Sequence, residues 1–227
     1  MTMYELLTIG SCLTSVANLV WIERQLEDPE VRAHPAAREL ETKRRLSKIL
    51  ASLAFVMLAI PAFGRDGFGT WMFVGLVAGA VGDAALLGRG ARAFMIGLGA
   101  FLVGHIAYVV GVAHVVPPAK WLGAAGLGAM LPLLVATFAV RALWPKLGAF
   151  RIPVMVYIVA IVAMVVGAYA ARDQLAHGTM LAIGATLFFA SDLAVARDRF
   201  LARDFTNKLW GLPAYYLGQL LIAWAIR

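Results

Sequence analysis

Residues 152–171 read IPVMVYIVAIVAMVVGAYAA and contain no charged side chain. A helix rises about 1.5 Å per residue, so a run of this length can cross the hydrocarbon core of a bilayer, which is about 30 Å thick. Arg151 precedes the run and Arg172 follows it, as is usual where a helix leaves the membrane. The stretch therefore predicts a transmembrane helix.

Seven further apolar runs have a similar length, and most of the connections between them are short. Neighbouring runs should therefore pack as antiparallel helical hairpins. The long and strongly charged connection 23–45 is expected to be solvated and partly helical. We predict an all-α fold, a polytopic membrane helix bundle that forms one integral-membrane domain over residues 1–227. The eight predicted transmembrane helices are 4–22, 46–63, 71–88, 93–116, 121–140, 152–171, 178–196 and 209–226.

The composition of the whole chain agrees with this fold class. Hydrophobic residues make up 62% of the chain and charged residues 15%, whereas a soluble domain carries about 25% charged residues. A soluble domain of this size could not bury so much apolar surface, so the composition excludes an ordinary soluble enzyme and a disordered chain. Cys12 is the one cysteine, which excludes a disulfide scaffold.

Lysine and arginine are distributed unevenly between the predicted loops. Sixteen of the twenty fall in the odd-numbered loops when Lys48 is counted with the first loop. By the positive-inside rule, these loops are expected in the cytoplasm and both termini outside. The N-terminus lacks the basic start of a cleavable signal peptide, so the first span should be retained. Short loops are typical of a bacterial inner (plasma) membrane, which is the expected location.

Few polar side chains interrupt the predicted spans. An ionisable group costs about 2.5–3.5 kcal/mol near the bilayer centre, so each such residue is a candidate for function. Asp83 and Asp192 lie about 8 Å inside the cytoplasmic ends of their spans, and His105 lies about 18 Å along its own. Polar groups of five spans fall in one half of the membrane, which predicts a polar cavity open to the cytoplasmic leaflet. The polar side chains concerned are Asn18, Lys48, Asp83, His105, Tyr108, Tyr157, Ser191, Asp192, Tyr215, Tyr216 and Gln219.

Each of these residues also has a purely structural interpretation. The two aspartates could form hydrogen bonds between helices or pair with Arg89 and Arg197 just outside the spans, and Lys48 could extend its ammonium to the membrane surface. His105 and the amide side chains could form hydrogen bonds between helices. For the aspartates we favour function, because two carboxyl groups at matched depth are costly to keep without a use.

Other chemistries find little support in the sequence. His105 is the only histidine in the predicted cavity, and there is no HExxH motif or cysteine cluster, so no metal site is expected. Ser191 precedes Asp192 without a histidine nearby in the sequence, which leaves a serine triad unsupported. No dinucleotide or Walker motif occurs, and the aromatic residues lie in membrane helices. We therefore expect no cofactor and no nucleic-acid partner.

Two of the predicted spans share a short motif. Residues 82–89 read GDAALLGR and residues 191–199 read SDLAVARDR, each with a small residue, an aspartate, an apolar turn and an arginine at the cytoplasmic exit. The two spans are third and seventh in the chain, so the motif predicts a four-plus-four parallel repeat. Such a repeat would place the two aspartates symmetrically about one central cavity.

Longer stretches around this motif resemble a known family. GDAALLGRGARAFMIGLGAFLVGHIAY (82–108) and ATLFFASDLAVARDRF (185–200) are similar to the two hallmark stretches of the YhhN-type lysoplasmalogenases. KLWGLPAYYLGQLLIA (208–223) resembles the last helix of that family, and the likeness extends from the second span onward. The family often has Lys-Pro at the start of the second span, whereas here Lys48 is followed by Ile49.

The resemblance implies an integral-membrane hydrolase that needs no metal or organic cofactor. It would take a lysophospholipid from the bilayer and cleave the vinyl ether bond of a lysoplasmalogen. The products would be a fatty aldehyde and glycerophosphoethanolamine or glycerophosphocholine. Vinyl ethers hydrolyse by protonation of the β-carbon, which forms an oxocarbenium ion that water then attacks. The enzyme thus needs a protonated acid and a nearby anion, as paired carboxyl groups provide in glycosidases.

The candidate residues can be assigned to these roles. Asp83 and Asp192 would divide the acid and anion roles, in an order that the sequence leaves open. Lys48 and Asn18 lie nearer the interface and would meet the phosphate headgroup. The remaining residues, expected to position water or substrate, are His105, Tyr108, Ser191, Tyr216 and Gln219.

Two other functions compete with a vinyl ether hydrolase. A proton-coupled transporter of small molecules or lipids would also show internal repeats, prolines within spans and intramembrane carboxylates. An intramembrane aspartyl protease would carry a GxGD motif. The matching stretch here, Ala80-Val81-Gly82-Asp83, lacks the first glycine.

Overall fold

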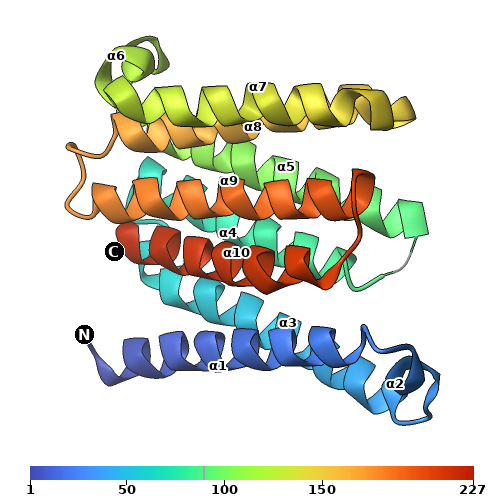
Figure 1. The fold of residues 1–227 in the computed structure, drawn as a ribbon. Helices are drawn as coiled ribbons and strands as arrows, with labels where there is room; N and C mark the ends of the chain where they lie inside the picture. The colour runs from blue at the N-terminus through green and yellow to red at the C-terminus, as the bar shows by residue number, and fades with distance from the viewer. Residues whose placement is uncertain (89) are drawn as a thin grey trace.

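The computed structural model describes residues 1–88 and 90–227, which form a bundle of long, roughly parallel and antiparallel helices (Figure 1). The predicted pairing with Arg89 lies outside the described residues. No strand occurs in either described stretch, so the all-α prediction is confirmed. The long helices are α1 (Met3–Gln25), α3 (Ala37–Ala59), α4 (Gly67–Ala85), α5 (Gly90–Ala113), α7 (Met130–Leu143), α8 (Arg151–Ala170), α9 (Gly178–Phe200) and α10 (Phe205–Ala225).

Within the described residues, seven helical segments are long and apolar enough to cross a membrane. They correspond to the first seven predicted spans. The eighth predicted span corresponds to α10, which has 21 residues and packs along α9 (Figure 1), but Asn207, Lys208 and Gln219 interrupt its apolar sequence. Large apolar side chains on the outer surface, such as Leu127, Phe138 and Ile152, are exposed as expected for contact with lipid.

The fifth predicted span, 121–140, is not one continuous helix. The short α6 (Trp121–Ala125) ends at Gly126, whose positive φ of 54° interrupts the helix, and a 3₁₀ segment leads into α7. The charged connection 23–45 is partly helical, as predicted. It contains α2 (Pro29–Ala33), and α3 begins at Ala37, nine residues before the predicted start at 46. The i,i+4 ion pair between Glu39 and Lys43, 2.7 Å long, is one reason that α3 extends so far beyond its apolar part.

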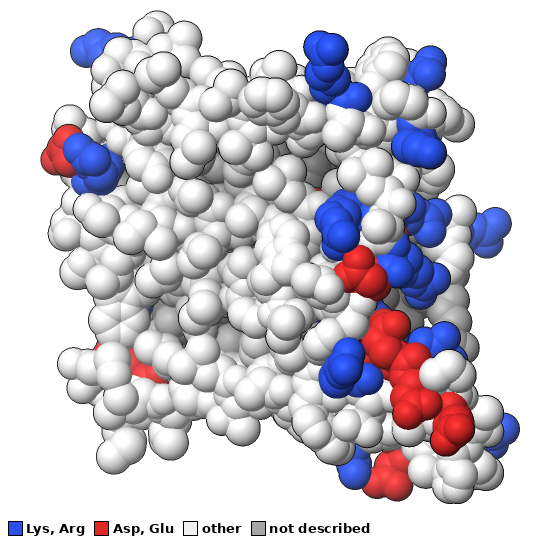
Figure 2. Space-filling model, viewed as in Figure 1, with Lys and Arg blue, Asp and Glu red and all other residues white. Residues whose placement is uncertain are grey.

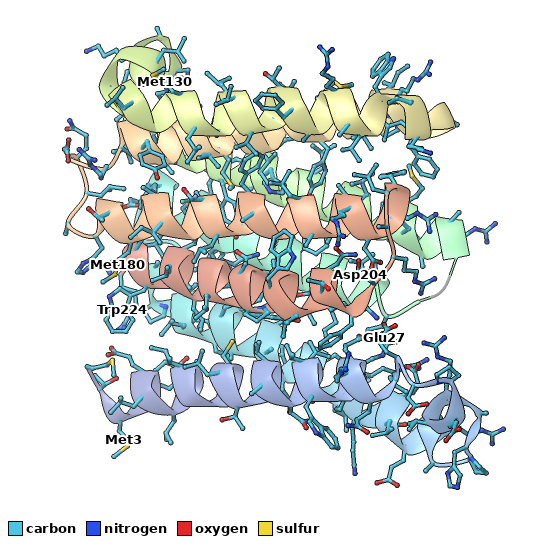
Figure 3. The ribbon with its side chains drawn as sticks, in the orientation of Figure 1. Met3, Glu27, Met130, Met180, Asp204 and Trp224 are labelled. Atoms are coloured by element: carbon cyan, nitrogen blue, oxygen red, sulfur yellow. The ribbon has the colours of Figure 1, made fainter. Side chains whose placement is uncertain are left out.

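The two ends of the bundle differ in charge. Met3, Met180 and Trp224 lie at the end that also carries both termini, whereas Glu27 and Asp204 lie at the opposite end (Figure 3). Most of the lysine and arginine side chains on the visible face gather at that opposite end (Figure 2). The lysine and arginine residues that are concentrated in the odd-numbered loops of the sequence therefore lie together at one end of the molecule.

The hairpins α4–α5 and α9–α10 occupy corresponding places in the two halves of the chain and pack closely. This arrangement is compatible with the four-plus-four repeat, which stays a prediction. In the second hairpin the close packing depends on two glycines. A Cβ atom added at Gly184 would lie 2.8 Å from the Gly218 carbonyl oxygen, and one at Gly218 would lie 2.8 Å from the Gly184 carbonyl oxygen.

We expect Gly184→Ala to destabilise the protein by about 1–3 kcal/mol, because the new methyl group meets backbone that cannot move aside without separating the two helices. Thermal unfolding in detergent, followed by tryptophan fluorescence, measures the change. Gly99→Ala on α5 is the matched control, since nothing lies within 4 Å of its added Cβ. Equal melting temperatures for the two variants would contradict this account of the hairpin.

Candidate functional site

One large cavity opens within the bundle, with a volume of about 980 Å³. Asp83 of α4 and Asp192 of α9 both line it, together with side chains of α3, α5, α7, α8 and α10. The cavity reaches from these two carboxyl groups to charged residues at the basic end of the bundle, including Arg199, Arg203 and Lys208. The two aspartates that the sequence singled out thus face one common space.

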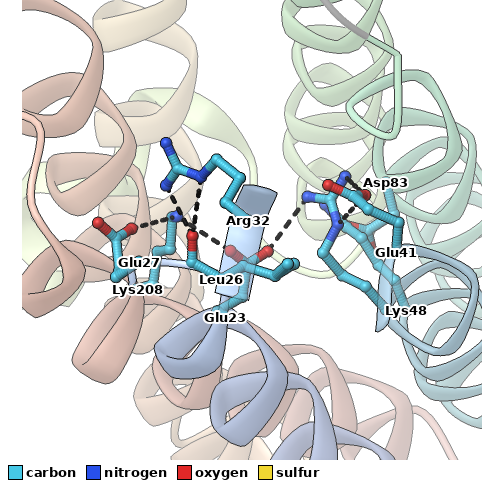
Figure 4. Close-up of polar contacts among 9 residues, drawn as sticks. Glu23, Leu26, Glu27, Arg32, Glu41, Lys48, Asp83 and Lys208 are labelled. Carbon is cyan, nitrogen blue, oxygen red and sulfur yellow. Dashed lines mark hydrogen bonds and ion pairs between the residues drawn. The ribbon is translucent and has the colours of Figure 1, made fainter. Parts of the chain in front are cut away.

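Asp83 is held by two side chains of α3. Lys48 Nζ lies 3.2 Å from Asp83 Oδ1 (Figure 4). The Ser52 hydroxyl donates a hydrogen bond of 2.7 Å to Oδ2. Lys48 and Ser52 are four residues apart and therefore share one face of the helix. The Asp83 side chain is 5% exposed and that of Lys48 13%, so this is a largely buried ion pair. A cation and a hydrogen-bond donor therefore both lie against this carboxyl group.

Asp192 has different partners. The Tyr157 hydroxyl of α8 donates a hydrogen bond of 2.9 Å to Asp192 Oδ2. His105 of α5 points its Nε2 atom at the same oxygen, at a distance of 3.5 Å. No lysine or arginine among the described residues forms an ion pair with Asp192, whose side chain is 16% exposed. Among the described residues, His105 is therefore the partner of this carboxyl that can carry a positive charge.

The tautomer of His105 follows from its other nitrogen. Nδ1 lies 2.7 Å from the Phe101 carbonyl oxygen, which can only accept, so Nδ1 carries a hydrogen. In a neutral ring Nε2 then has a lone pair and no hydrogen. A lone pair facing a carboxylate oxygen would be repulsive, so one proton belongs between Nε2 and Asp192. His105 is fully buried, and placing that proton on the carboxyl avoids burying a charged pair.

A buried polar network connects this region with α10. The Tyr108 hydroxyl donates to Gln219 Oε1 at 2.8 Å, and Gln219 Nε2 donates to the Tyr215 hydroxyl at 3.3 Å. Gly79 on α4 leaves room for the network, because a Cβ there would lie 2.6 Å from Gln219 Nε2. Tyr215, at the end of this network, lines the cavity together with Asp83.

Several predicted site residues lie elsewhere or serve the fold. Asn18 is exposed and donates to the Ser47 hydroxyl at 2.8 Å, which joins α1 to α3 away from the cavity. Ser191 lines the cavity, but its hydroxyl donates at 2.7 Å to the Phe188 carbonyl oxygen of its own helix. Tyr216 is buried, with its hydroxyl 3.4 Å from the Lys48 carbonyl oxygen.

Two of the structural interpretations are wrong. Arg197 pairs with Asp204 at 3.0 Å and hydrogen-bonds Asn207, so it does not neutralise Asp192. Lys48 does not extend to the membrane surface, because its ammonium is turned inward to Asp83. For Asp192, the tertiary partners therefore differ from the nearest arginine in the sequence.

The structure also adds residues that the sequence did not assign to the site. Ser52 is a small hydroxyl residue in an apolar helix, and only its i+4 spacing from Lys48 could have marked it. Tyr157 and Tyr215 were visible as polar groups within spans, but nothing in the sequence connected either to a particular aspartate. Helix rotation decides these contacts, and a sequence of apolar helices specifies rotation weakly.

The charged end of the cavity is held by a network of ion pairs (Figure 4). Glu23 of α1 contacts Arg44 of α3 at 3.2 Å and Lys208 of α10 at 2.9 Å. Lys208 also lies 2.9 Å from Glu27, and Arg44 lies 2.9 Å from Glu41. These contacts tie three helices together beside the opening and leave a mouth rich in both signs of charge.

Residues 43–226 match the YhhN family. The Bos taurus protein "Lysoplasmalogenase TMEM86A" is 34% identical over 167 residues, which are 68% of this chain and 64% of the bovine protein. "Lysoplasmalogenase" of Mycobacterium tuberculosis (strain CDC 1551 / Oshkosh) is 32% identical over 202 residues, 83% of this chain and 73% of that protein. "Lysoplasmalogenase TMEM86B" of Mus musculus is 32% identical over 182 residues, 77% of this chain and 70% of its own. No solved structure matches the chain.

Proposed function

This chain belongs to the YhhN family, and we propose that it is a lysoplasmalogenase, an integral-membrane hydrolase of the vinyl ether bond of lysoplasmalogens. One observation carries the proposal beyond the likeness to named relatives. Two carboxyl groups face one cavity, and their partners differ: Asp83 lies against the Lys48 ammonium, whereas Asp192 lies against the His105 ring and the Tyr157 hydroxyl. That is the asymmetry that acid-catalysed vinyl ether hydrolysis requires.

In this mechanism Asp192 is the general acid. Its proton lies toward the bare Nε2 of His105 and is transferred to the β-carbon of the vinyl ether, which converts the ether into an oxocarbenium ion. The hydrogen bond from Tyr157 fixes the orientation of the carboxyl group. His105 acts through Asp192 as a positioning residue, because it favours the protonated carboxyl before reaction and can accept a hydrogen bond from it.

Asp83 is the anion of the pair. Its carboxylate, paired with Lys48, stabilises the oxocarbenium ion and accepts a proton from the attacking water. The resulting hemiacetal breaks its bond to the glycerol oxygen. That oxygen takes the proton from Asp83, and the hemiacetal hydroxyl returns a proton to Asp192. One water is consumed, and both carboxyl groups recover their initial states.

The cavity has a matching place for the headgroup. Arg199 and Arg203 line it on the basic side, and no carboxylate among the described residues forms an ion pair with either. A phosphate diester there would meet two guanidinium groups, the side chains best suited to phosphate. We assign the phosphate to these arginines in place of Lys48 and Asn18, since Lys48 is committed to Asp83.

We also propose that the basic end of the bundle faces the cytoplasm of a bacterial plasma membrane. The gathering of lysine and arginine at the end opposite both termini supports this orientation (Figure 2). The cavity would then open toward the cytoplasmic leaflet, where a single-chain lipid could enter from the bilayer.

The decisive test is hydrolysis of lysoplasmenylethanolamine by the purified protein in deuterium oxide. We expect fatty aldehyde that carries one solvent deuterium at the carbon next to the carbonyl, because protonation of that carbon is the first step. Aldehyde incubated with the Asp192→Asn variant controls for exchange after release. Aldehyde without deuterium would overturn the mechanism. No aldehyde, combined with movement of the lysolipid across vesicles, would favour the transporter.

A further inference from the structure

A second hollow lies next to the main cavity, between α7 and α8, with a volume of about 570 Å³. We call it the α7–α8 groove. Its lining is apolar apart from the Thr137 hydroxyl and the Trp121 indole N–H, which is already bonded to the Val116 carbonyl oxygen at 2.8 Å. The groove is bounded by Trp121, Leu133 and Val140 on one side and by Ile158, Val162 and Val166 on the other.

The groove and the catalytic cavity meet at two residues. Ala136 of α7 and Ile158 of α8 line both spaces. Ile158 directly follows Tyr157, whose hydroxyl holds Asp192, so the groove begins beside the proposed general acid. Ala136 is buried, and its side chain is a single methyl group. It therefore occupies little space between the groove and the cavity.

We propose that the α7–α8 groove binds the alkenyl chain of the substrate, and that Ala136 sets the length of chain the enzyme accepts. This inference rests on the proposed lysoplasmalogenase function. The two adjacent spaces, which share Ala136 and Ile158 as lining residues, present a charged mouth, then two carboxyl groups, then an apolar groove. A lysoplasmalogen presents the same order: a charged headgroup, a vinyl ether and a hydrocarbon chain.

The dimensions of the groove agree with a single lipid chain. From Ile158 to Val166 the groove runs eight residues along α8, about 12 Å at the rise of a helix. One leaflet of the hydrocarbon core is about 15 Å thick. The chain beyond the reacting carbons would thus lie in the groove for most of its length.

The position of α7 at the edge of the bundle leaves the groove open to the bilayer. Gly126 and Gly148, with φ of 54° and 51°, adopt left-handed conformations before and after this helix. α7 consequently stands at the edge of the bundle against α8 (Figure 1). A hydrocarbon chain can therefore reach the groove sideways from the lipid phase while the headgroup stays at the charged mouth.

The test is Ala136→Phe, assayed with lysoplasmenylethanolamines that carry a hexadecenyl or a propenyl chain. We expect kcat/KM for the hexadecenyl substrate to fall at least about tenfold, the loss that follows when two methylene groups leave an apolar site. The propenyl substrate should change less than about twofold, because it has a single carbon beyond the vinyl ether and does not reach the groove. Ala142→Phe is the matched control, since Ala142 is exposed on the same helix and lines neither space.

Equal losses for the two chains would overturn the proposal, since Ala136 would then serve only the shape of the site. No loss for either chain would overturn it as well and would leave the groove to bulk membrane lipid. A second measurement does not depend on activity. A saturated ether lysolipid that is brominated along its chain should quench the fluorescence of Trp121. The contribution of Trp121 is the part of the quenching that is absent from the Trp121→Phe variant, and Ala136→Phe should reduce this part. If the wild-type protein showed this quenching but no hydrolysis, the proposed function would be rejected, whereas the binding of a lipid chain in the groove would stand.

Discussion

Asp192→Asn is expected to lower the turnover of lysoplasmenylethanolamine by about 10²–10⁴-fold, the range that a positioned general acid contributes. Asparagine has nearly the same shape and can still accept the Tyr157 hydrogen bond, but it has no proton to give to carbon. Because the side chain lies on a cavity wall that stays intact, the variant should fold normally. Aldehyde release measures the effect, and the melting temperature verifies the fold.

Asp173→Asn is the matched control for this experiment. Asp173 is an exposed aspartate in the loop between α8 and α9, paired with Arg172 at 3.0 Å and remote from the cavity. It should retain wild-type turnover. If Asp192→Asn kept more than about a tenth of the activity, Asp192 could not be the general acid. The proton would then have to come from another group on the cavity.

Lys48→Met is expected to have the largest effect on stability. It removes the cation beside Asp83 and leaves a buried carboxylate with hydroxyl groups such as that of Ser52 but without a positive charge, at an expected cost of about 3–5 kcal/mol. The double variant Lys48→Met/Asp83→Asn should recover most of this loss, because it buries no unpaired charge. It should nevertheless stay inactive, since Asp83 supplies the anion in the proposed mechanism. Thermal unfolding in detergent and aldehyde release separate the two effects.

Lys43→Met provides the comparison on the same helix. Lys43 pairs with Glu39 at 2.7 Å, but both side chains are more than half exposed. Breaking such a surface pair should cost about 0–1 kcal/mol. If the double variant at positions 48 and 83 were as unstable as Lys48→Met, the instability would come from lost packing of the lysine stem rather than from the unpaired carboxylate.

The partial success of the sequence analysis at the site has a physical explanation. Asp83, Asp192, Lys48 and His105 were identifiable because an ionisable side chain in an apolar span is costly and therefore conspicuous. Ser52 was not, since a serine in a membrane helix costs little and can bond to its own backbone. Asn18 was conspicuous for the same reason as the aspartates, yet its amide joins α1 to α3 outside the cavity. Because burying a polar group is costly, such a group is expected to have a hydrogen-bond or charge partner. The sequence does not show which residue that partner is.

The sequence by itself determined the all-helical class, the apolar segments that form the long helices, and the charge difference between the two ends of the bundle. Each of these features depends on the local composition of about twenty residues. The thickness of the hydrocarbon core sets the length of an apolar helix, and the charge of a loop sets the side of the membrane on which that loop lies. Only the tertiary structure decided that Lys48 pairs with Asp83 and that His105 and Tyr157 face Asp192. It alone also joined the α7–α8 groove to the cavity. These features depend on how each helix is rotated about its axis. Apolar residues surround most of these helices on all sides, so that rotation is fixed by packing and not by a local pattern.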